Sequence, residues 1–207
     1  MTERFDQDFW DDRYRTAPQL WSGAPNRHLV TVATSLPPGS ALDVGCGEGA
    51  DAVWLAEHGW QVTATDISTV ALDRAREAAG GRGTEVAGRI EWAQADLREW
   101  RPPRRTYDLV SAQYLQLPPD LRSALWTQLA AVVAPAGTLL LVGHDVSDAH
   151  VAEHRAHQPE LFFSGADVVR QLADPRWTVV ADTVTYRRQA DGPELVDVVV
   201  RATRQPQ

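Results

Sequence analysis

The chain has 207 residues, of which 43% are hydrophobic, and this is enough for one domain with a sizeable core. A formal net charge of −8 disfavours a nucleic-acid partner, because phosphate backbones are bound by stripes of basic side chains. All 20 basic side chains are arginine, which excludes a lysine Schiff base and a P-loop lysine, and the single cysteine excludes an intramolecular disulfide or a cysteine metal cage.

The first residues of the chain are charged and lack the apolar core of a secretory signal. No apolar run approaches the 18 or so residues that a membrane-spanning helix needs. We therefore expect a cytoplasmic protein that does not span a membrane.

Residues 5–16 predict a short amphipathic helix, and residues 26–35 predict a second one with Asn26 as its N-cap. The sequence Leu-Pro-Pro-Gly at 36–39 ends this second helix. Strands and helices then alternate, which predicts a parallel sheet with helices on both faces. The strands are expected at 40–45, 61–65, 89–94, 107–111 and 138–143, and the helices near 50–58, 69–79 and 120–133.

The pattern changes after residue 143. A polar, histidine-rich segment at 144–160 precedes a helix expected at 164–173. Two long strands follow, from Trp177 to Arg187 and from Glu194 to Arg204, and the Ala-Asp-Gly-Pro sequence at 190–193 is a hairpin signal. The last two strands should therefore be antiparallel.

The most informative stretch runs from Ala41 to Asp66. It predicts a buried strand, a glycine-rich turn, a helix and a second strand that ends at an acid, which is the layout of a nucleoside-cofactor site. The spacing of Gly45, Gly47 and Ala50, with Asp66 about 20 residues further on, also satisfies the dinucleotide-binding fingerprint. Spacing alone therefore leaves both NAD and S-adenosylmethionine open.

Charge helps to choose between these two cofactors. Asp43 and Glu48 place carboxylates beside the turn, whereas a pyrophosphate needs backbone N–H groups with no anion near them. S-adenosylmethionine has no phosphate and carries an ammonium and a sulfonium, which acids attract. The charges favour S-adenosylmethionine, and an NAD(P)-dependent oxidoreductase remains as the alternative.

The sequence LDVGCGEGADAVWLAEHGWQVTATDIS at 42–68 resembles the first two motifs of class I S-adenosylmethionine-dependent methyltransferases. It is most similar to the small single-domain type that includes the tellurite-resistance and thiopurine methyltransferases. Gln-Ala-Asp-Leu at 94–97, Tyr-Asp-Leu-Val-Ser-Ala at 107–112 and the segment at 134–142 resemble the later motifs, in the family's order. The resemblance covers about residues 40–145.

The resemblance implies an α/β fold with a doubly wound, seven-stranded, mostly parallel sheet, an antiparallel last strand and an N-terminal helical cap. It implies one domain, with a cap at 1–36, a cofactor-binding core at 37–145, and a lid segment with closing strands at 146–207. Asp66 would accept hydrogen bonds from the ribose hydroxyls, and Asp96 would bind the adenine amino group. The cofactor-binding residues expected from the core are Asp43, Gly45, Cys46, Gly47, Asp66, Ile67, Asp96, Leu97 and Gln113.

The N-terminal segment also resembles the small methyltransferases, in which it folds over the cofactor. Trp21 and Tyr14 are candidates for a cation–π contact with the sulfonium, and Arg13 is a candidate for holding the methionine carboxylate. Packing of the cap on the core is the alternative interpretation of the tryptophans.

Two further candidates lie where strands end, since strand carboxyl ends face the site in such folds. His144 is the best candidate for a general base, because an imidazole takes a proton from a hydroxyl or thiol near neutral pH. Tyr114 follows the fourth strand, and the sequence there lacks the Asn/Asp-Pro-Pro-aromatic motif of adenine and glutamine methylation. We expect both residues to act in catalysis.

His150, His154 and His157 would share one face of a helix, and we interpret them as part of a solvated lid and expect no metal. The sequence thus predicts an S-adenosylmethionine-dependent methyltransferase that acts by in-line displacement on a small-molecule O, S or N nucleophile. The third hypothesis is a regulatory subunit that binds S-adenosylmethionine without catalysing a reaction. The expected partner is a small-molecule acceptor, with no nucleic acid and no membrane, in a monomer or homodimer.

Overall fold

The computed structural model describes residues 6–115, 117–148, 159–187 and 194–206. It contains two compact units, residues 1–111 and 112–207, which are described separately. Seven strands form a sheet in the order β3-β2-β1-β4-β5-β7-β6, with β4 (Tyr107–Gln113) crossing the boundary between the units. This order and the strand directions given below confirm the predicted seven-stranded, mostly parallel α/β sheet.

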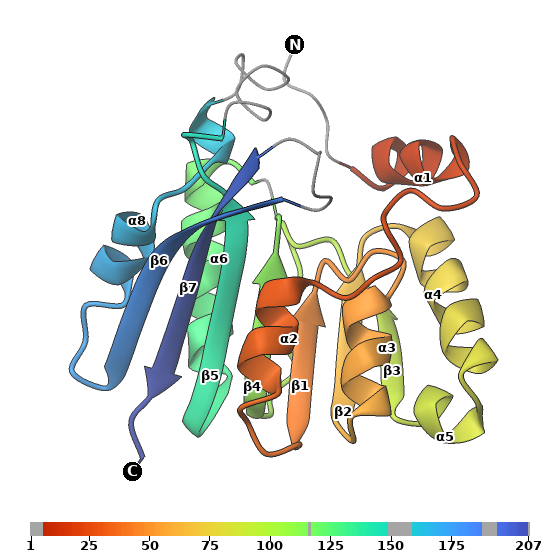
Figure 1. Cartoon of the computed structure of the whole chain (residues 1–207), viewed down its shortest axis with the longest axis horizontal. Helices are drawn as coiled ribbons and strands as arrows, with labels where there is room; N and C mark the ends of the chain where they lie inside the picture. The colour runs from red at the N-terminus through yellow and green to blue at the C-terminus, as the bar shows by residue number, and fades with distance from the viewer. Residues whose placement is uncertain (1–5, 116, 149–158, 188–193, 207) are drawn as a thin grey trace. The chain divides into compact units, whose positions relative to one another are not determined.

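The first unit is built on three parallel strands, β1 (Ser40–Val44), β2 (Gln61–Asp66) and β3 (Ile90–Gln94). These strands are apolar because both faces are covered, and Leu42 and Val44 are fully buried. Figure 1 shows α2 (Arg27–Ala33) and α3 (Ala50–Glu57) lying over β1 and β2. The remaining helices of the unit are α1 (Gln7–Arg15), α4 (Thr69–Gly81) and the short α5 (Thr84–Ala87).

The helix starts of the first unit follow from capping side chains. Asp6, Asn26 and Ser68 each accept a hydrogen bond from a backbone N–H in the first turn of α1, α2 and α4. The cap at Asn26 is as predicted. Gly49 precedes α3 with φ +81°, so this helix begins directly from the glycine-rich turn.

The second unit contains β5 (Val133–His144), β6 (Trp177–Arg187) and β7 (Glu194–Arg204), with β7 antiparallel to both neighbours. The bounds of β6 and β7 are those predicted, and the antiparallel last strand is confirmed. The helices among its described residues are α6 (Pro119–Ala131), the 3-10 turn η1 (Pro159–Leu161) and α8 (Gly165–Gln171), and α8 packs against β6 (Figure 1). The predicted hairpin turn at 190–193 lies outside the described residues.

The start of β5 differs from the prediction, because the strand begins at Val133 and not at 138. Its pairing with β7 nevertheless covers only residues 138–144. The preceding residues include Pro135, which has no N–H to donate, and Ala136, whose φ is +63°. The residues before 138 therefore belong to β5 but precede the part of the strand that pairs with β7.

Candidate functional site

The turn between β1 and α3 depends on three glycines in the left-handed backbone region, Gly45, Gly47 and Gly49, with φ of 73°, 53° and 81°. The N–H groups of Gly45 and Cys46 donate to the carbonyl of Thr65, at 2.8 and 2.9 Å. A Cβ on Gly47 would lie 2.9 Å from Tyr14 Oη. The turn therefore requires glycine for both conformation and space.

Asp43 lies on β1, two residues before this turn, and its side chain is buried at 3% exposure. Among the residues that the structure describes, its Oδ2 atom has no hydrogen-bond partner. Burial raises the pKa of Asp43 well above its usual range, and the nearby carboxylates of Asp51 and Asp66 add to that rise. A buried, unpartnered carboxylate is costly, and a cationic ligand would compensate it.

Asp66 at the end of β2 is oriented by the backbone. Its Oδ2 accepts from Gly47 N at 2.8 Å, and its Oδ1 accepts from Ser68 N at 2.9 Å. Burial raises the pKa of Asp66, and these two hydrogen bonds oppose the rise. Each carboxylate oxygen keeps a second lone pair for further donors.

Cys46 is half-buried in the turn, and burial, together with Asp66, raises the pKa of its thiol well above its usual value. A thiol that stays protonated is a poor nucleophile. Its thiol is therefore unsuited to attack a substrate, and its expected place beside the cofactor stays a prediction.

An open hollow of about 380 Å³ lies beside the end of β3. Asp96 lines it, and Arg98 binds both oxygens of the Asp96 carboxylate, which lowers the pKa of Asp96. Leu97 is half-buried next to it, and Ile67 lines the same hollow. The structure thus places two of the predicted residues, Asp96 and Ile67, at the same hollow.

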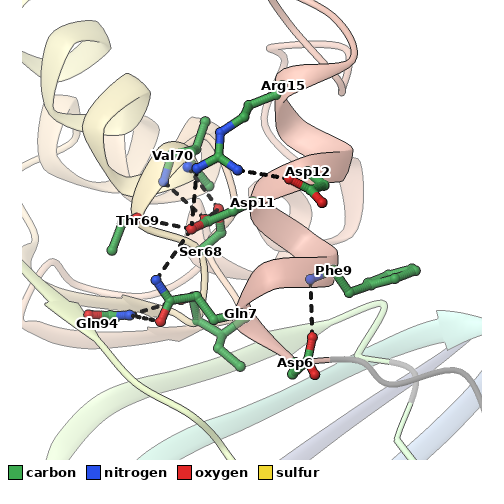
Figure 2. Close-up of polar contacts among 12 residues, drawn as sticks. Asp6, Gln7, Phe9, Asp11, Asp12, Arg15, Ser68, Thr69, Val70 and Gln94 are labelled. Carbon is green, nitrogen blue, oxygen red and sulfur yellow. Dashed lines mark hydrogen bonds and ion pairs between the residues drawn. The ribbon is translucent and has the colours of Figure 1, made fainter.

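Helix α1 is fastened to the start of α4 by Asp11, which is 5% exposed. Its carboxylate accepts from Ser68 Oγ at 2.6 Å, Thr69 Oγ1 at 3.2 Å and Val70 N at 3.3 Å (Figure 2). In the same view, Gln7 reaches across to Gln94 at the end of β3, with a hydrogen bond of 2.8 Å. The N-terminal helix is therefore tied to two elements next to the hollow.

Glu48 binds the loop that follows α1. The sequence analysis did not predict this role. Its carboxylate accepts from the N–H groups of Leu20 and Trp21 at 3.0–3.1 Å, and it pairs with Arg74 at 2.9 Å. Arg74 also donates to the carbonyl of Tyr14. We call this group, Glu48 with Arg74, the cap clamp. The charge of Glu48 is engaged by the chain itself, whereas the Oδ2 atom of Asp43 has no partner among the described residues.

The aromatic candidates of the cap lie against the turn. Tyr14 is buried, and its Oη accepts from Trp21 Nε1 at 3.0 Å. Trp21 is 48% exposed, and the Arg13 guanidinium lies 5.9 Å from its ring and from that of Trp10. The cap therefore presents an exposed indole and an exposed guanidinium next to Gly47.

The second unit contains its own cluster of polar side chains. Asp197 on β7 is fully buried, and it accepts from Tyr114 Oη at 2.7 Å and contacts His144 Nδ1 at 3.2 Å. The rings of Tyr114 and His144 lie 4.6 Å apart. We call Tyr114, His144 and Asp197 the Asp197 cluster. Gln113, the residue before Tyr114 in the chain, is half-buried at the end of β4.

Sequence reasoning found His144 and Tyr114 but missed Asp197. The signal was present, because Asp197 and Leu195 lie on the same buried side of β7, where an acid is unusual. His150, His154 and His157 lie outside the described residues. Among the residues that are described, no group of three or more His, Cys, Asp or Glu is placed to hold a metal ion. In that same part of the chain, no helix is long and apolar enough to cross a membrane.

Comparison with known proteins agrees with this geometry. Residues 41–137 match the family model described as "Methyltransferase domain". A solved structure entitled "Conversion of a Disulfide Bond into a Thioacetal Group during Echinomycin Biosynthesis" matches with a TM-score of 0.72 and 26% identity, over 96% of this chain and 91% of that one. Residues 41–137 are therefore similar to a methyltransferase domain, and the fold is similar to that of this solved structure.

Two curated relatives show different extents of similarity. Ribosomal RNA small subunit methyltransferase C of Alcanivorax borkumensis is 33% identical over 52% of this chain and 33% of its own length. The 2-heptyl-1-hydroxyquinolin-4(1H)-one methyltransferase of Mycobacteroides abscessus is 26% identical over 95% of this chain and 87% of its own. The chain spans a third to about half of the length of the first curated relatives that it matches.

Proposed function

We propose that the chain is an enzyme that transfers a methyl group from S-adenosylmethionine to a small-molecule acceptor. The observation that carries this proposal is the buried, unpartnered Oδ2 of Asp43 beside the glycine turn. This atom suits a cationic cofactor, whereas a pyrophosphate would be repelled by the same carboxylate.

The residues present fit the cofactor. Asp43 would attract its cationic part, Asp66 and Ile67 would hold the ribose, and Asp96 with Leu97 would hold the adenine. Gly45, Cys46 and Gly47 would form the floor of the site, and Trp21, Tyr14 and Arg13 would complete it. When bound, S-adenosylmethionine supplies an electrophilic methyl group. The protein holds the acceptor's nucleophilic atom in line with it, and such alignment lowers the barrier by several kcal/mol.

A small-molecule acceptor is favoured by two observations. The relative that acts on a hydroxyquinolinone matches nearly the whole chain, whereas the ribosomal RNA relative matches about half of it. The net charge of −8 also disfavours a phosphate backbone. That the protein is a monomer or a homodimer stays a prediction.

The experiment that tests this function is thermal unfolding with S-adenosylhomocysteine, NADH or NADPH, each at about 1 mM. A ligand at 100 times its Kd adds about 2.7 kcal/mol to the free energy of unfolding, which at this size raises Tm by about 5–10 °C. We expect this rise with S-adenosylhomocysteine alone. A rise with a nicotinamide cofactor alone would instead support the oxidoreductase.

Turnover separates the enzyme from a regulatory subunit. With S-adenosylmethionine and a panel of hydroxyl, thiol and amine acceptors, an enzyme produces S-adenosylhomocysteine in an acceptor-dependent way. A protein that binds the cofactor and gives no product with any acceptor class would be a binding subunit.

A further inference from the structure

The Asp197 cluster carries an inference about the acceptor, and this inference rests on the proposed function. We infer that Asp197 is a positioning residue that orients His144 as a general base, and that the methyl acceptor is therefore a hydroxyl compound. A thiol acceptor that has already lost its proton at neutral pH would not need this arrangement.

The sheet itself brings the two side chains together. His144 is the last residue of β5, and it lies directly opposite Asp197 in the antiparallel pairing with β7. A carboxylate oxygen only accepts hydrogen bonds, so the 3.2 Å contact places the imidazole proton on Nδ1. The lone pair is then on Nε2, which is the form of the ring that acts as a base.

His144 is also available to a ligand. Its side chain is 21% exposed, whereas Asp197 is completely buried. Within the described part of the chain, Nε2 of His144 has no hydrogen-bond partner. One nitrogen is therefore fixed by the protein while the other remains open, as expected for a base that meets its substrate from solvent.

Tyr114 supports this arrangement at a cost in backbone strain. Its φ is +52°, a conformation that a bulky residue rarely adopts, and such strain concentrates at functional sites. Its N–H donates to the carbonyl of Val142 at 2.8 Å, and its hydroxyl donates to Asp197. Burial and the charge of Asp197 raise the pKa of Tyr114, so this hydroxyl keeps its proton and serves as a donor to Asp197, leaving His144 as the base.

The chemistry then selects the acceptor class. A phenol-like hydroxyl with a pKa of about 10 holds its proton at pH 7, whereas an aromatic thiol has lost its own. As the acceptor O–H bond breaks, its proton moves to Nε2 and the oxygen bonds to the transferred methyl carbon. The electron pair of the broken carbon–sulfur bond stays on sulfur. The products are a methyl ether, S-adenosylhomocysteine and an imidazolium that returns its proton to water.

The test compares matched hydroxyl and thiol acceptors, phenol with thiophenol and 1-naphthol with 1-naphthalenethiol, in the wild type and in three variants. Asp197→Asn keeps the size of the side chain but donates to Nδ1, which moves the imidazole proton to Nε2. His144→Ala removes the base. Asp182→Asn, on the exposed side of β6, is the matched control for an Asp-to-Asn change.

We expect Asp197→Asn and His144→Ala to lower kcat for the hydroxyl acceptors by about 10²–10⁴-fold, which is the usual contribution of a general base. The rates with the thiols should change less than about threefold, and imidazole should partly restore His144→Ala. If Asp197→Asn does not fold, the recovery of His144→Ala activity by added imidazole tests whether His144 acts as the base. Asp182→Asn should match the wild type.

Three results would overturn the inference while leaving the proposed function intact. The first is a wild type that binds S-adenosylhomocysteine and methylates the thiols but neither of the hydroxyl acceptors. The second is a loss of less than threefold in both variants. The third is an equal loss with thiols and hydroxyls, which would indicate a structural role. Absence of S-adenosylhomocysteine binding would instead contradict the proposed function.

Discussion

Replacing Asp51 by Asn should make the cofactor-free protein more stable at neutral pH. Asp51 lies in the first turn of α3, where its Oδ1 accepts from the N–H of Asn26 at 2.5 Å. Burial raises its pKa from 3.8 to about 6, and this hydrogen bond opposes the rise. Its charge also contributes to the raised pKa of Asp43. Asn keeps the acceptor for Asn26 and removes the charge.

The magnitude follows from linkage. A carboxyl whose pKa is higher in the folded state favours folding while it is protonated, and this contribution is lost as the pH rises from about 4 through about 6. A shift of about 2.2 units corresponds to about 3 kcal/mol above that window. At pH 4.5 only about 1 kcal/mol of this contribution has been lost. The gain from Asp51→Asn should therefore grow with pH.

The assay is thermal and urea unfolding of both proteins at pH 4.5 and 7.5. We expect Asp51→Asn to be more stable by about 3 kcal/mol at pH 7.5, or about 6–12 °C in Tm, and by about 1 kcal/mol at pH 4.5. Asp73→Asn is the control, because the Asp73 side chain is 77% exposed and its pair with Arg76 is worth less than about 1 kcal/mol. A gain that does not depend on pH, or a loss of stability at pH 7.5, would refute this reasoning.

Two further substitutions test the cap and the turn. Glu48→Gln should speed hydrogen exchange at the amides of Leu20 and Trp21 about 10–100-fold, because hydrogen bonds to a charged acceptor are worth about 1.5–3 kcal/mol. The control is Glu57→Gln, which removes an ion pair at the surface and should leave the exchange of these two amides unchanged. Equal exchange rates in the two variants would rule out the cap clamp. Gly49→Ala should destabilise the fold by about 2–5 kcal/mol, because its Cβ would lie 2.7 Å from Ala75 Cβ at φ +81°, whereas Gly80→Ala, with open space in α4, should stabilise it by up to about 1 kcal/mol. Similar free energies of unfolding for the two alanine variants would contradict the steric account of the turn.

Much of the fold could be predicted because its signals are local. The bounds of β6 and β7 matched, since both strands are long runs of β-formers on either side of a turn signal. The cap of α2 at Asn26 was likewise readable from neighbouring residues. The start of β5 was not, because its first residues are extended without pairing to β7.

The polar parts of the candidate site were harder to predict, because they depend on contacts between distant residues. Glu48 was interpreted as a charge for the cofactor, but it binds N–H groups 27 and 28 residues away in the chain. Asp197 meets His144 across 53 residues, and the register of β7 against β5 brings them together. Sequence patterns locate the strand ends, whereas the partners of each carboxylate follow from the tertiary structure.

The most direct test of the central claim is calorimetric titration of S-adenosylhomocysteine into the wild type and Asp43→Asn. Asn preserves the shape of the buried side chain at the turn and removes its charge. The account predicts binding to the wild type and an affinity about 10–100-fold lower in the variant, the equivalent of one charged hydrogen bond. Equal affinity in both proteins, or no binding to a folded wild type, would contradict the assignment of Asp43 and the cofactor site built on it.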